Sequence, residues 1–533
     1  MLSTLDFMQS TSNNFGEYLN KIKEGIKKVK PEIWLILILI FALFLRLYFF
    51  LGINLNDDLC YLDAAHQITQ GTFVLNKWII APRLMMNYPI AFFYTLFGVS
   101  DFSGALYFLL CSIGSVAVAY GIGKILFNEK VGLASAFLMS FYPIEVIYGT
   151  TIVPDVPLAF FLGLSVLLFF IGEKKNKNIY YLLGGIAIGA GWLVKSLAIL
   201  IILFYLAYFI LDKIFNFKFL ISGETQKKPL SLIKKIFWIR KGFILLSLGF
   251  LLILSLEGLL YYVVNNDFFF RFKVEMNNYN SSLQGVTLDP NYYPNVLFAQ
   301  SLPFFNFLGY FFIFFCFSIF FLVLFEKNKK YLIFPAWTIS ILLWLQYGTM
   351  NPFELTPMHR IYRFLTIISI PISLTIGYFI VGSRFNKKRI FNVLSIIIVS
   401  VLLVSSIFFI SKANLLMNQG MLDYKLSADY LKKYPDIDIY TDFVTVGELN
   451  FLLGYEREND LKDLALVNSP EEIKNAFVVV NATRGFVELP DFRDTLPDFI
   501  WDPPSDWVVV RVIKESYFDF YGTYDTTIYY VPP

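Results

Sequence analysis

Eleven apolar runs follow one another through the first 411 residues, most of them close to the 20 or so residues that a helix needs to cross a bilayer. The chain has 533 residues, of which 57% are hydrophobic and 16% charged, against about 25% charged residues in an ordinary soluble domain. With a net charge of only +3, this composition disfavours a water-soluble globule, a disordered chain and a nucleic-acid-binding module. The sequence therefore predicts a polytopic α-helical membrane protein. The expected spans are 33–51, 101–123, 131–148, 154–172, 179–193, 196–211, 242–264, 302–325, 331–348, 361–382 and 390–411.

The distribution of Lys and Arg predicts the orientation of these spans, because cytoplasmic loops carry an excess of both residues. If the N-terminal segment 1–32 is cytoplasmic, the cytoplasmic segments hold 25 Lys and Arg and the outer loops hold 7. In this orientation two long loops face outside. The first is 52–100; the second, 265–301, is either a lid that closes over a substrate or an ordinary loop.

An odd number of spans also places the C-terminal residues 412–533 outside the cell membrane. This tail is much more polar than the rest of the chain and alternates helical and strand-like patterns, so we expect a small extracytoplasmic α/β domain. Its helical and strand-like runs are Lys425–Tyr434, Ile437–Thr441, Phe477–Asn481, Trp507–Ile513 and Thr526–Val531.

Acidic residues stand at the outer ends of several spans, where an ionisable group usually faces a cavity, a partner or a site. Asp57 and Asp58 follow the first span and could supply a general base or a cation ligand, or could cap a surface helix. Asp155, flanked by prolines, could cap the fourth span or approach Asp57 as a second cation ligand. Glu145 lies a turn or two away and could join the same cavity.

Basic residues gather on the same face. His359, Arg360 and Arg363 lie within five residues just before the tenth span, against the positive-inside bias, and so indicate an anionic ligand or a lipid headgroup contact. Lys195 and Arg46 lie near the outer ends of other spans, where they could bind a lipid phosphate or extend to the headgroups. The two sets together predict a cavity in which carboxylates lie beside a cationic phosphate site.

The cysteines and histidines are few. Cys60, Cys111 and Cys316 form no CxxC pattern, and His66 and His359 are the two histidines of the chain. A disulfide framework and a zinc site are therefore not expected.

Five motifs occur in a consistent order over about residues 40–380. This order resembles the GT-C membrane glycosyltransferases, in particular the dolichyl-phosphate-mannose–protein mannosyltransferase and lipid A aminoarabinose transferase families (glycosyltransferase families 39 and 83). The sequence departs from the usual pattern at Asp58, Val194 and Phe364, where these families commonly have Glu, Thr and Tyr. The motifs are Arg46-Leu47 followed by Asp57-Asp58-Leu-Cys-Tyr61-Leu-Asp63-Ala-Ala, Pro89 to Ser100, Tyr142-Pro143 with Asp155-Val-Pro-Leu-Ala, Gly191-Trp-Leu-Val-Lys195, and Arg363-Phe-Leu-Thr-Ile-Ile-Ser-Ile-Pro371.

The resemblance implies a GT-C fold with a catalytic domain in 33–411. It also implies inverting transfer of a sugar from a polyprenyl phosphate, dolichyl or undecaprenyl, to a protein, lipid or glycan acceptor. In this reading Asp57, with Asp58 beside it, is the catalytic carboxylate that acts as general base and takes a proton from the acceptor. A divalent cation, Mg²⁺ or Mn²⁺, could lie between Asp57 and Asp155. The residues expected to bind the donor phosphate are Lys195, Arg363, Arg360, His359 and Arg46, and those expected to position substrate are Glu145, Arg83 and Tyr61.

Two other classes of function remain open at this point. A transporter or lipid flippase would also place charges in the membrane, but transporters commonly have repeated halves around a midplane site, and the halves of this chain differ. A non-enzymatic sugar-binding membrane protein would use the tail 412–533 and would tolerate replacement of Asp57, Lys195 and Arg363.

Overall fold

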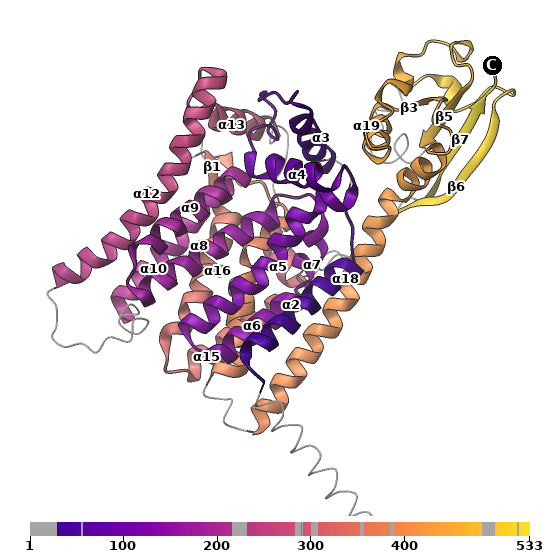
Figure 1. The fold of residues 1–533 in the computed structure, drawn as a ribbon. Coiled ribbons are helices and arrows are strands. Elements are labelled where there is room, and N and C mark those ends of the chain that lie inside the picture. The colour runs from indigo at the N-terminus through magenta and orange to yellow at the C-terminus, as the bar shows by residue number, and fades with distance from the viewer. Residues whose placement is uncertain are drawn as a thin grey trace, which may run out of the picture.

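The computed structural model describes residues 29–54, 57–215, 232–282, 289, 291–299, 308–351, 356–383, 389–481, 496–519 and 522–533; most of the segment 1–32 lies outside them. A bundle of long helices carries a small sheet domain at one end, and the last long helix connects the two (Figure 1). The helices are α2 (Pro31–Tyr48), α3 (Asp57–Gln70), α4 (Leu84–Phe97), α5 (Asp101–Leu126), α6 (Glu129–Ser140), α7 (Pro143–Ile147), α8 (Asp155–Lys175), α9 (Asn178–Val194), α10 (Ile201–Phe215), α12 (Leu232–Asn265), α13 (Phe270–Ser282), α14 (Tyr292–Pro294), α15 (Phe311–Phe325), α16 (Ile333–Tyr347), α17 (Ser369–Gly377), α18 (Arg389–Leu431) and α19 (Phe443–Leu452). The strands are β1 (Thr349–Asn351), β2 (Thr356–Pro357), β3 (Asp438–Thr441), β4 (Leu461–Asp463), β5 (Ala476–Asn481), β6 (Val508–Asp519) and β7 (Gly522–Val531).

The helical membrane architecture agrees with the sequence, but the expected count of eleven spans is not confirmed. Within the described residues, seven helices are long and apolar enough to cross a membrane, or eight if the bent pair Glu129–Ser140 and Pro143–Thr150 is one span. Three other expected spans coincide with shorter helices: α9 has 17 residues, and α15 and α16 have 15 each.

The bend in the third span has a clear cause in the sequence. Pro143 begins α7 directly after α6 ends, and proline cannot donate the backbone hydrogen bond that would continue the helix. The two pieces meet at 61°. The apolar run 131–148 is therefore a broken span, and its second piece turns toward the end of the bundle that carries the sheet domain.

The glycine-rich run before Lys195 serves helix packing. A Cβ atom on Gly185 would lie 1.9 Å from the carbonyl oxygen of Leu246, and one on Gly249 would lie 2.2 Å from that of Leu182. Only glycine therefore allows α9 and α12 to approach this closely, as small residues do between membrane helices.

The segment 52–100, expected to be a loop, contains the helices α3 and α4. Both lie at the end of the bundle that carries the sheet domain, as does α13, which occupies part of the expected loop 265–301 (Figure 1). Apolar side chains such as Leu62 and Ile90 are buried beneath these helices, which explains why the segment folds onto the bundle.

The C-terminal sheet has the order β4-β3-β5-β7-β6. The strands β4, β3 and β5 are parallel, and β5, β7 and β6 are antiparallel. Ile439 of β3 lies between Leu461 and Phe477 of its two neighbours, and all three side chains are buried with those of α19. Four of these strands coincide with strand-like runs in the sequence, whereas β4 and α19 were not expected.

The helix α18 runs without a break through the expected domain boundary at 412, and the stretch Lys425–Tyr434 is largely its final part. On the way it binds the segment that follows α2 and the start of α5. The Asn414 amide donates to the carbonyl oxygen of Phe49 (2.9 Å), and Lys425 pairs with Asp101 (3.2 Å).

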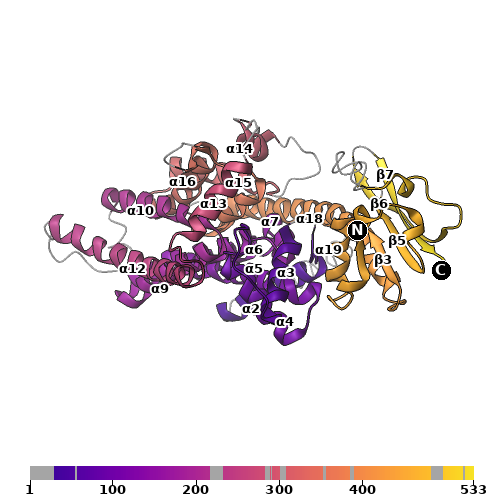
Figure 2. The ribbon, with the colours of Figure 1, turned by 90° about the horizontal axis from the view of Figure 1, so that it is seen from above.

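The sheet domain also contacts α3 directly, and α19 lies beside α3 when the molecule is seen from above (Figure 2). The Tyr455 hydroxyl donates to the carboxylate of Asp63, and the Tyr455 ring stacks on His66 with centroids 4.0 Å apart. The helix that begins with Asp57 is thus held from both the bundle and the sheet domain.

Candidate active site

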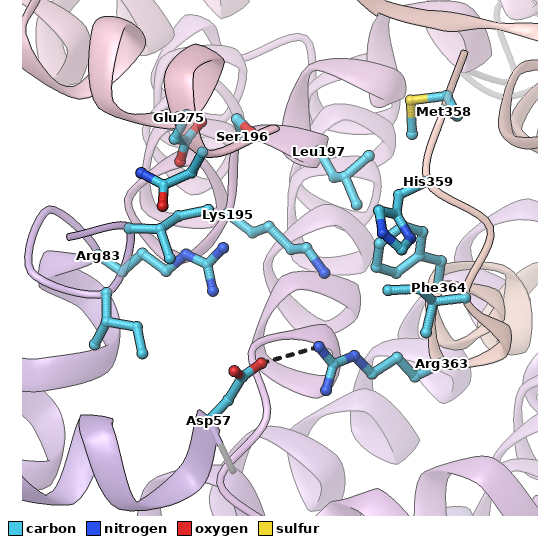
Figure 3. Close-up of a pocket in the computed structure, with 14 residues that line it drawn as sticks. Asp57, Arg83, Lys195, Ser196, Leu197, Glu275, Met358, His359, Arg363 and Phe364 are labelled. Atoms are coloured by element: carbon cyan, nitrogen blue, oxygen red, sulfur yellow. Dashed lines mark hydrogen bonds and ion pairs between the residues drawn. The ribbon is translucent and has the colours of Figure 1, made fainter. Parts of the chain in front are cut away.

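A cavity of about 390 Å³ opens between α3, the segment before α4, the α9–α10 junction, α13 and the segment before α17. Figure 3 shows Asp57, Arg83, Lys195 and Arg363 directed toward its centre from four different parts of the chain. The cavity is lined by Asp57, Ile79, Ile80, Arg83, Lys195, Ser196, Leu197, Glu275, Asn278, Met358, His359, Ile361, Arg363 and Phe364.

Two carboxylates and two cations alternate along one wall of the cavity. Arg363 contacts Asp57 (Nη2 to Oδ2, 3.2 Å) and Asp155 (Nε to Oδ2, 3.4 Å), and Lys195 Nζ contacts Asp155 Oδ1 at 2.8 Å. The Asp57 side chain is 49% exposed, whereas that of Asp155 is fully buried. Asp57 is therefore accessible to a substrate, and Asp155 is a buried counter-charge for both cations.

The local backbone explains how Lys195 reaches this wall. Lys195 separates α9 from the short helix η2 (Ser196–Leu200) and has extended backbone angles, φ −160° and ψ 136°. Its side chain therefore leaves the helix axis and points to Asp155, the first residue of α8. The ring of Phe364 lies 3.9 Å from the Lys195 ammonium, close enough for a cation–π contact.

Arg363 is presented by the centre of the bundle. It lies in the helical turn η5 (Tyr362–Ile368) that continues into α17, and every residue from Phe364 to Ile380 is buried. The guanidinium stands where this central helix begins, beside the start of α8.

Asp58 and Tyr61 lie behind the cavity wall. Asp58 Oδ2 accepts hydrogen bonds from the backbone N–H groups of Asn54 (3.0 Å) and Ile152 (3.4 Å), and burial raises the pKa of its carboxyl well above the usual value. The Tyr61 hydroxyl is buried and accepts a hydrogen bond from Arg83. Asp58 thus ties the start of α3 to the segment before α8, while Tyr61 orients Arg83.

His359 and Arg360 separate, although they are adjacent in sequence. His359 lines the cavity, and burial together with the charges of Lys195 and Arg363 lowers the pKa of its imidazole. It therefore lines the cavity in surroundings that disfavour its charged form, unlike the cations Lys195 and Arg363. Arg360 donates to the carbonyl oxygens of Asp289 and Gln346 (3.2 Å to the latter) and does not line the cavity.

Arg46 and Glu145 also lie away from the cavity. The fully buried Arg46 donates to Ser112 Oγ (2.7 Å) and to the Ser140 carbonyl oxygen (2.9 Å). Glu145 accepts a hydrogen bond from Ser369 Oγ at 2.6 Å. The structure places both in a polar network that joins helices inside the bundle.

The arrangement does not fit a divalent cation between Asp57 and Asp155. Both carboxylates contact the guanidinium of Arg363, and Asp155 is in addition occupied by Lys195. No group of three or more His, Cys, Asp and Glu side chains that could hold a metal ion occurs in the described part of the chain.

The sequence did not point to Glu275, which lines the cavity from α13. The available signal was a set of charged residues at positions 257, 271 and 275, the first inside an apolar run. Arg271 Nη1 contacts Glu257 Oε1 at 2.9 Å and Arg271 Nε contacts Glu275 Oε1 at 3.1 Å.

Comparison with known proteins shows what part of this chain resembles. Residues 81–222 match the family described as dolichyl-phosphate-mannose-protein mannosyltransferase. Crystal structures of ArnT from Cupriavidus metallidurans are similar over 93% of this chain and 97% of theirs, with a TM-score of 0.58 and 11% identity in the apo state. The chain therefore has the fold of the GT-C membrane glycosyltransferases.

The ArnT structure bound to undecaprenyl phosphate gives a TM-score of 0.56 at 12% identity. The chain is also 29% identical over 216 residues to YkcB of Bacillus subtilis, provisionally named a mannosyltransferase. That match covers 38% of this chain and 28% of the relative, so the chain spans little more than a quarter of it. Together the matches show the fold of the chain and a local similarity to mannosyltransferase sequences.

Proposed function

We propose that the protein transfers a sugar from a polyprenyl phosphate to an acceptor, with Asp57 as the base and Lys195 and Arg363 at the donor phosphate. The observation that carries this proposal is the exposed carboxylate of Asp57 beside two cations on one cavity wall. The family description over 81–222 and the undecaprenyl phosphate bound by the structurally similar ArnT support a lipid-phosphate donor.

In this proposal the charges act on the two ends of one displacement. An acceptor O–H or N–H gives its proton to Asp57 while its O or N attacks the anomeric carbon, and the bond from that carbon to the phosphate oxygen breaks. The electron pair stays on the lipid phosphate, whose growing charge Lys195 and Arg363 stabilise in a site largely shielded from water. Attack opposite the leaving group inverts the anomeric carbon, and no covalent sugar–enzyme intermediate forms.

Arg363 connects the two events. In the absence of substrate its guanidinium contacts Asp57, but a phosphate offers this planar group two oxygens for a bidentate contact. When the phosphate takes the guanidinium, the Asp57 carboxylate is released to accept a proton. Donor binding thus prepares the base.

The domains and orientation belong to the same proposal. Residues 33–411 form the catalytic domain and 412–533 the extracytoplasmic domain of a multi-pass cell-membrane protein with a cytoplasmic N-terminus. The excess of Lys and Arg on the opposite side supports this orientation. Labelling of a cysteine at Ser505, exposed in the sheet domain, tests it in a variant whose three native cysteines are replaced by serine. An impermeant maleimide should react in intact cells, and reaction only after lysis would reverse the orientation.

Asp57→Asn provides the main test. The purified protein in lipid nanodiscs is mixed with polyprenyl-phosphate mannose, glucose or aminoarabinose carrying a radiolabelled sugar, and release of sugar is measured. We expect the wild type to release sugar and Asp57→Asn to be slower by about 10²- to 10⁴-fold, because a general base contributes that much. Asp436→Asn, at an exposed position of the tail, is the matched control and should release sugar at the wild-type rate.

Two results would contradict the proposal. If folded Asp57→Asn released sugar at the wild-type rate, Asp57 would not be the base. If the wild type neither bound polyprenyl phosphate nor released sugar from any donor, the transferase function itself would be wrong, and a transporter or flippase would become the hypothesis to test.

A further inference from the structure

A buried charge cluster stands behind the α13 wall of the cavity. Arg271 lies between Glu257 and Glu275, and the side chains of all three are at most 7% exposed. Glu257 also accepts hydrogen bonds from Trp192 Nε1 (2.7 Å) and the Tyr261 hydroxyl (3.1 Å). The cluster thus joins α9, α12 and α13 and holds Glu275 in a fixed position.

Glu275 keeps part of its binding capacity free. Its Oε1 accepts from Arg271, whereas its Oε2 has no hydrogen-bond donor in the described part of the chain. One guanidinium also serves two carboxylates here, so the cluster holds an excess negative charge. A carboxylate oxygen that is open toward a cavity can accept a hydrogen bond from a ligand there. Glu275 lines the cavity, which indicates that the donor comes from the ligand.

Arg83 provides the complementary group in the same cavity. It is 9% exposed, its Nη1 is bound to Tyr61, and its Nε is buried without an acceptor in the described residues. Figure 3 shows the Arg83 side chain on the same side of the cavity as Glu275 and Ser196, while Arg363 and His359 lie on the other side. The cavity therefore presents a donor and an acceptor away from Arg363 and His359.

A hydroxyl group satisfies both, because it donates to a carboxylate and accepts from a guanidinium. An ammonium group satisfies Glu275 alone and is repelled by Arg83. We propose that Glu275 and Arg83 form the sugar subsite and select a neutral, hydroxylated sugar over an amino sugar. This inference rests on the proposed function and specifies the donor class within it.

The test compares lipids that differ only in the sugar. Binding to the full-length protein in nanodiscs is measured for undecaprenyl phosphate, undecaprenyl-phosphate mannose, undecaprenyl-phosphate glucose and undecaprenyl-phosphate 4-amino-4-deoxyarabinose. We expect at least one hexosyl lipid to bind more tightly than the amino-sugar lipid. Glu275→Gln should weaken binding of that hexosyl lipid by about tenfold or more, since hydrogen bonds to charged groups are the stronger ones. The affinity for undecaprenyl phosphate should stay within about twofold of the wild-type value.

Controls separate recognition from folding. Glu275→Gln keeps an acceptor for Arg271, and thermal unfolding checks that the variant is folded. Glu471→Gln, exposed in the tail, should change none of the affinities. Arg83→Gln should raise the affinity for the amino-sugar lipid relative to the hexosyl lipids, which a purely structural role would not do.

Three outcomes would overturn the subsite. These are tighter binding of the amino-sugar lipid by the wild type, equal losses for sugar-bearing and sugar-free lipids in Glu275→Gln, and no loss in that variant. Failure of the proposed function looks different, because undecaprenyl phosphate itself would then not bind.

Discussion

Asp155→Asn should destabilise the protein strongly, because it removes the buried counter-charge of Lys195 and Arg363. Asn keeps the shape of the side chain but not its charge, and the Lys195 ammonium, 2.8 Å away, loses its anionic partner in a site that is 9% exposed at most. Breaking a buried ion pair from one side costs about 3–5 kcal/mol of unfolding free energy. Lys195→Met should cost less, about 1–3 kcal/mol, because Asp155 keeps Arg363 at 3.4 Å.

The double variant Asp155→Asn/Lys195→Met tests whether Asp155 and Lys195 stabilise the protein as a pair. It removes both charges of the pair, so its loss should be smaller than the sum of the single losses by about 1 kcal/mol or more. Stability is measured by denaturant titration in detergent, with and without Mn²⁺ or Mg²⁺. Strictly additive losses would refute the pairing. Stabilisation of the wild type but not of Asp155→Asn by the metal would instead identify Asp155 as a cation ligand.

The remaining predictions concern contacts outside the cavity. Tyr455→Phe, which deletes the hydroxyl that donates to Asp63, should cost about 1 kcal/mol and speed proteolysis between the sheet domain and the bundle. Burial raises the pKa of Asp63 to about 6, above its value in the unfolded chain, so the folded state binds this proton more tightly. Stability from this group should therefore be complete below about pH 4 and be lost as the pH rises through 6; melting curves at pH 5 and 7.5 should differ more for the wild type than for Asp63→Asn. Arg46→Met should cost about 1–3 kcal/mol, since it leaves the buried Ser140 carbonyl without this donor, yet undecaprenyl phosphate should bind as to the wild type. The Tyr455 contact would be contradicted if Tyr455→Phe were cleaved at the wild-type rate, and the role of Asp63 if Asp63→Asn kept the difference between the two pH values. Weaker lipid binding by Arg46→Met would contradict the placement of Arg46 away from the cavity.

The sequence predicted the membrane architecture well because the length and hydropathy of an apolar run are enough to identify a membrane helix. It also pointed to most of the charged residues of the cavity wall, since Asp57, Lys195 and Arg363 each lie at the end of an apolar run. Their contacts could not be predicted from spacing: Asp57 and Arg363 are 306 positions apart, and only the packing of α3 against the bundle's centre brings them together.

Unpredictable packing also explains why the sequence misplaced other charged residues or passed over them. Arg46 and Glu145 are charged residues in apolar surroundings, as site residues often are. A single sequence does not tell whether a charged side chain near a helix end points to a cavity or to a neighbouring helix. Arg271 and Glu275 were overlooked because they lie in a polar stretch that reads as a loop. Their role depends on Glu257, which is on a different helix.

The continuous helix α18 has a practical consequence for modular exchange between related proteins. A chimaera joined at residue 412, where the composition changes, would pair a foreign stretch of α18 with the native segment after α2. It would exchange Asn414 and Lys425, which bind the carbonyl oxygen of Phe49 and the carboxylate of Asp101. A junction placed after Leu431, where α18 ends, keeps these contacts and moves the sheet as a unit. The graft would then need to reproduce the contact of Tyr455 with α3 and the hydrogen bonds of Asn481 and Thr526 to Asp423 of α18.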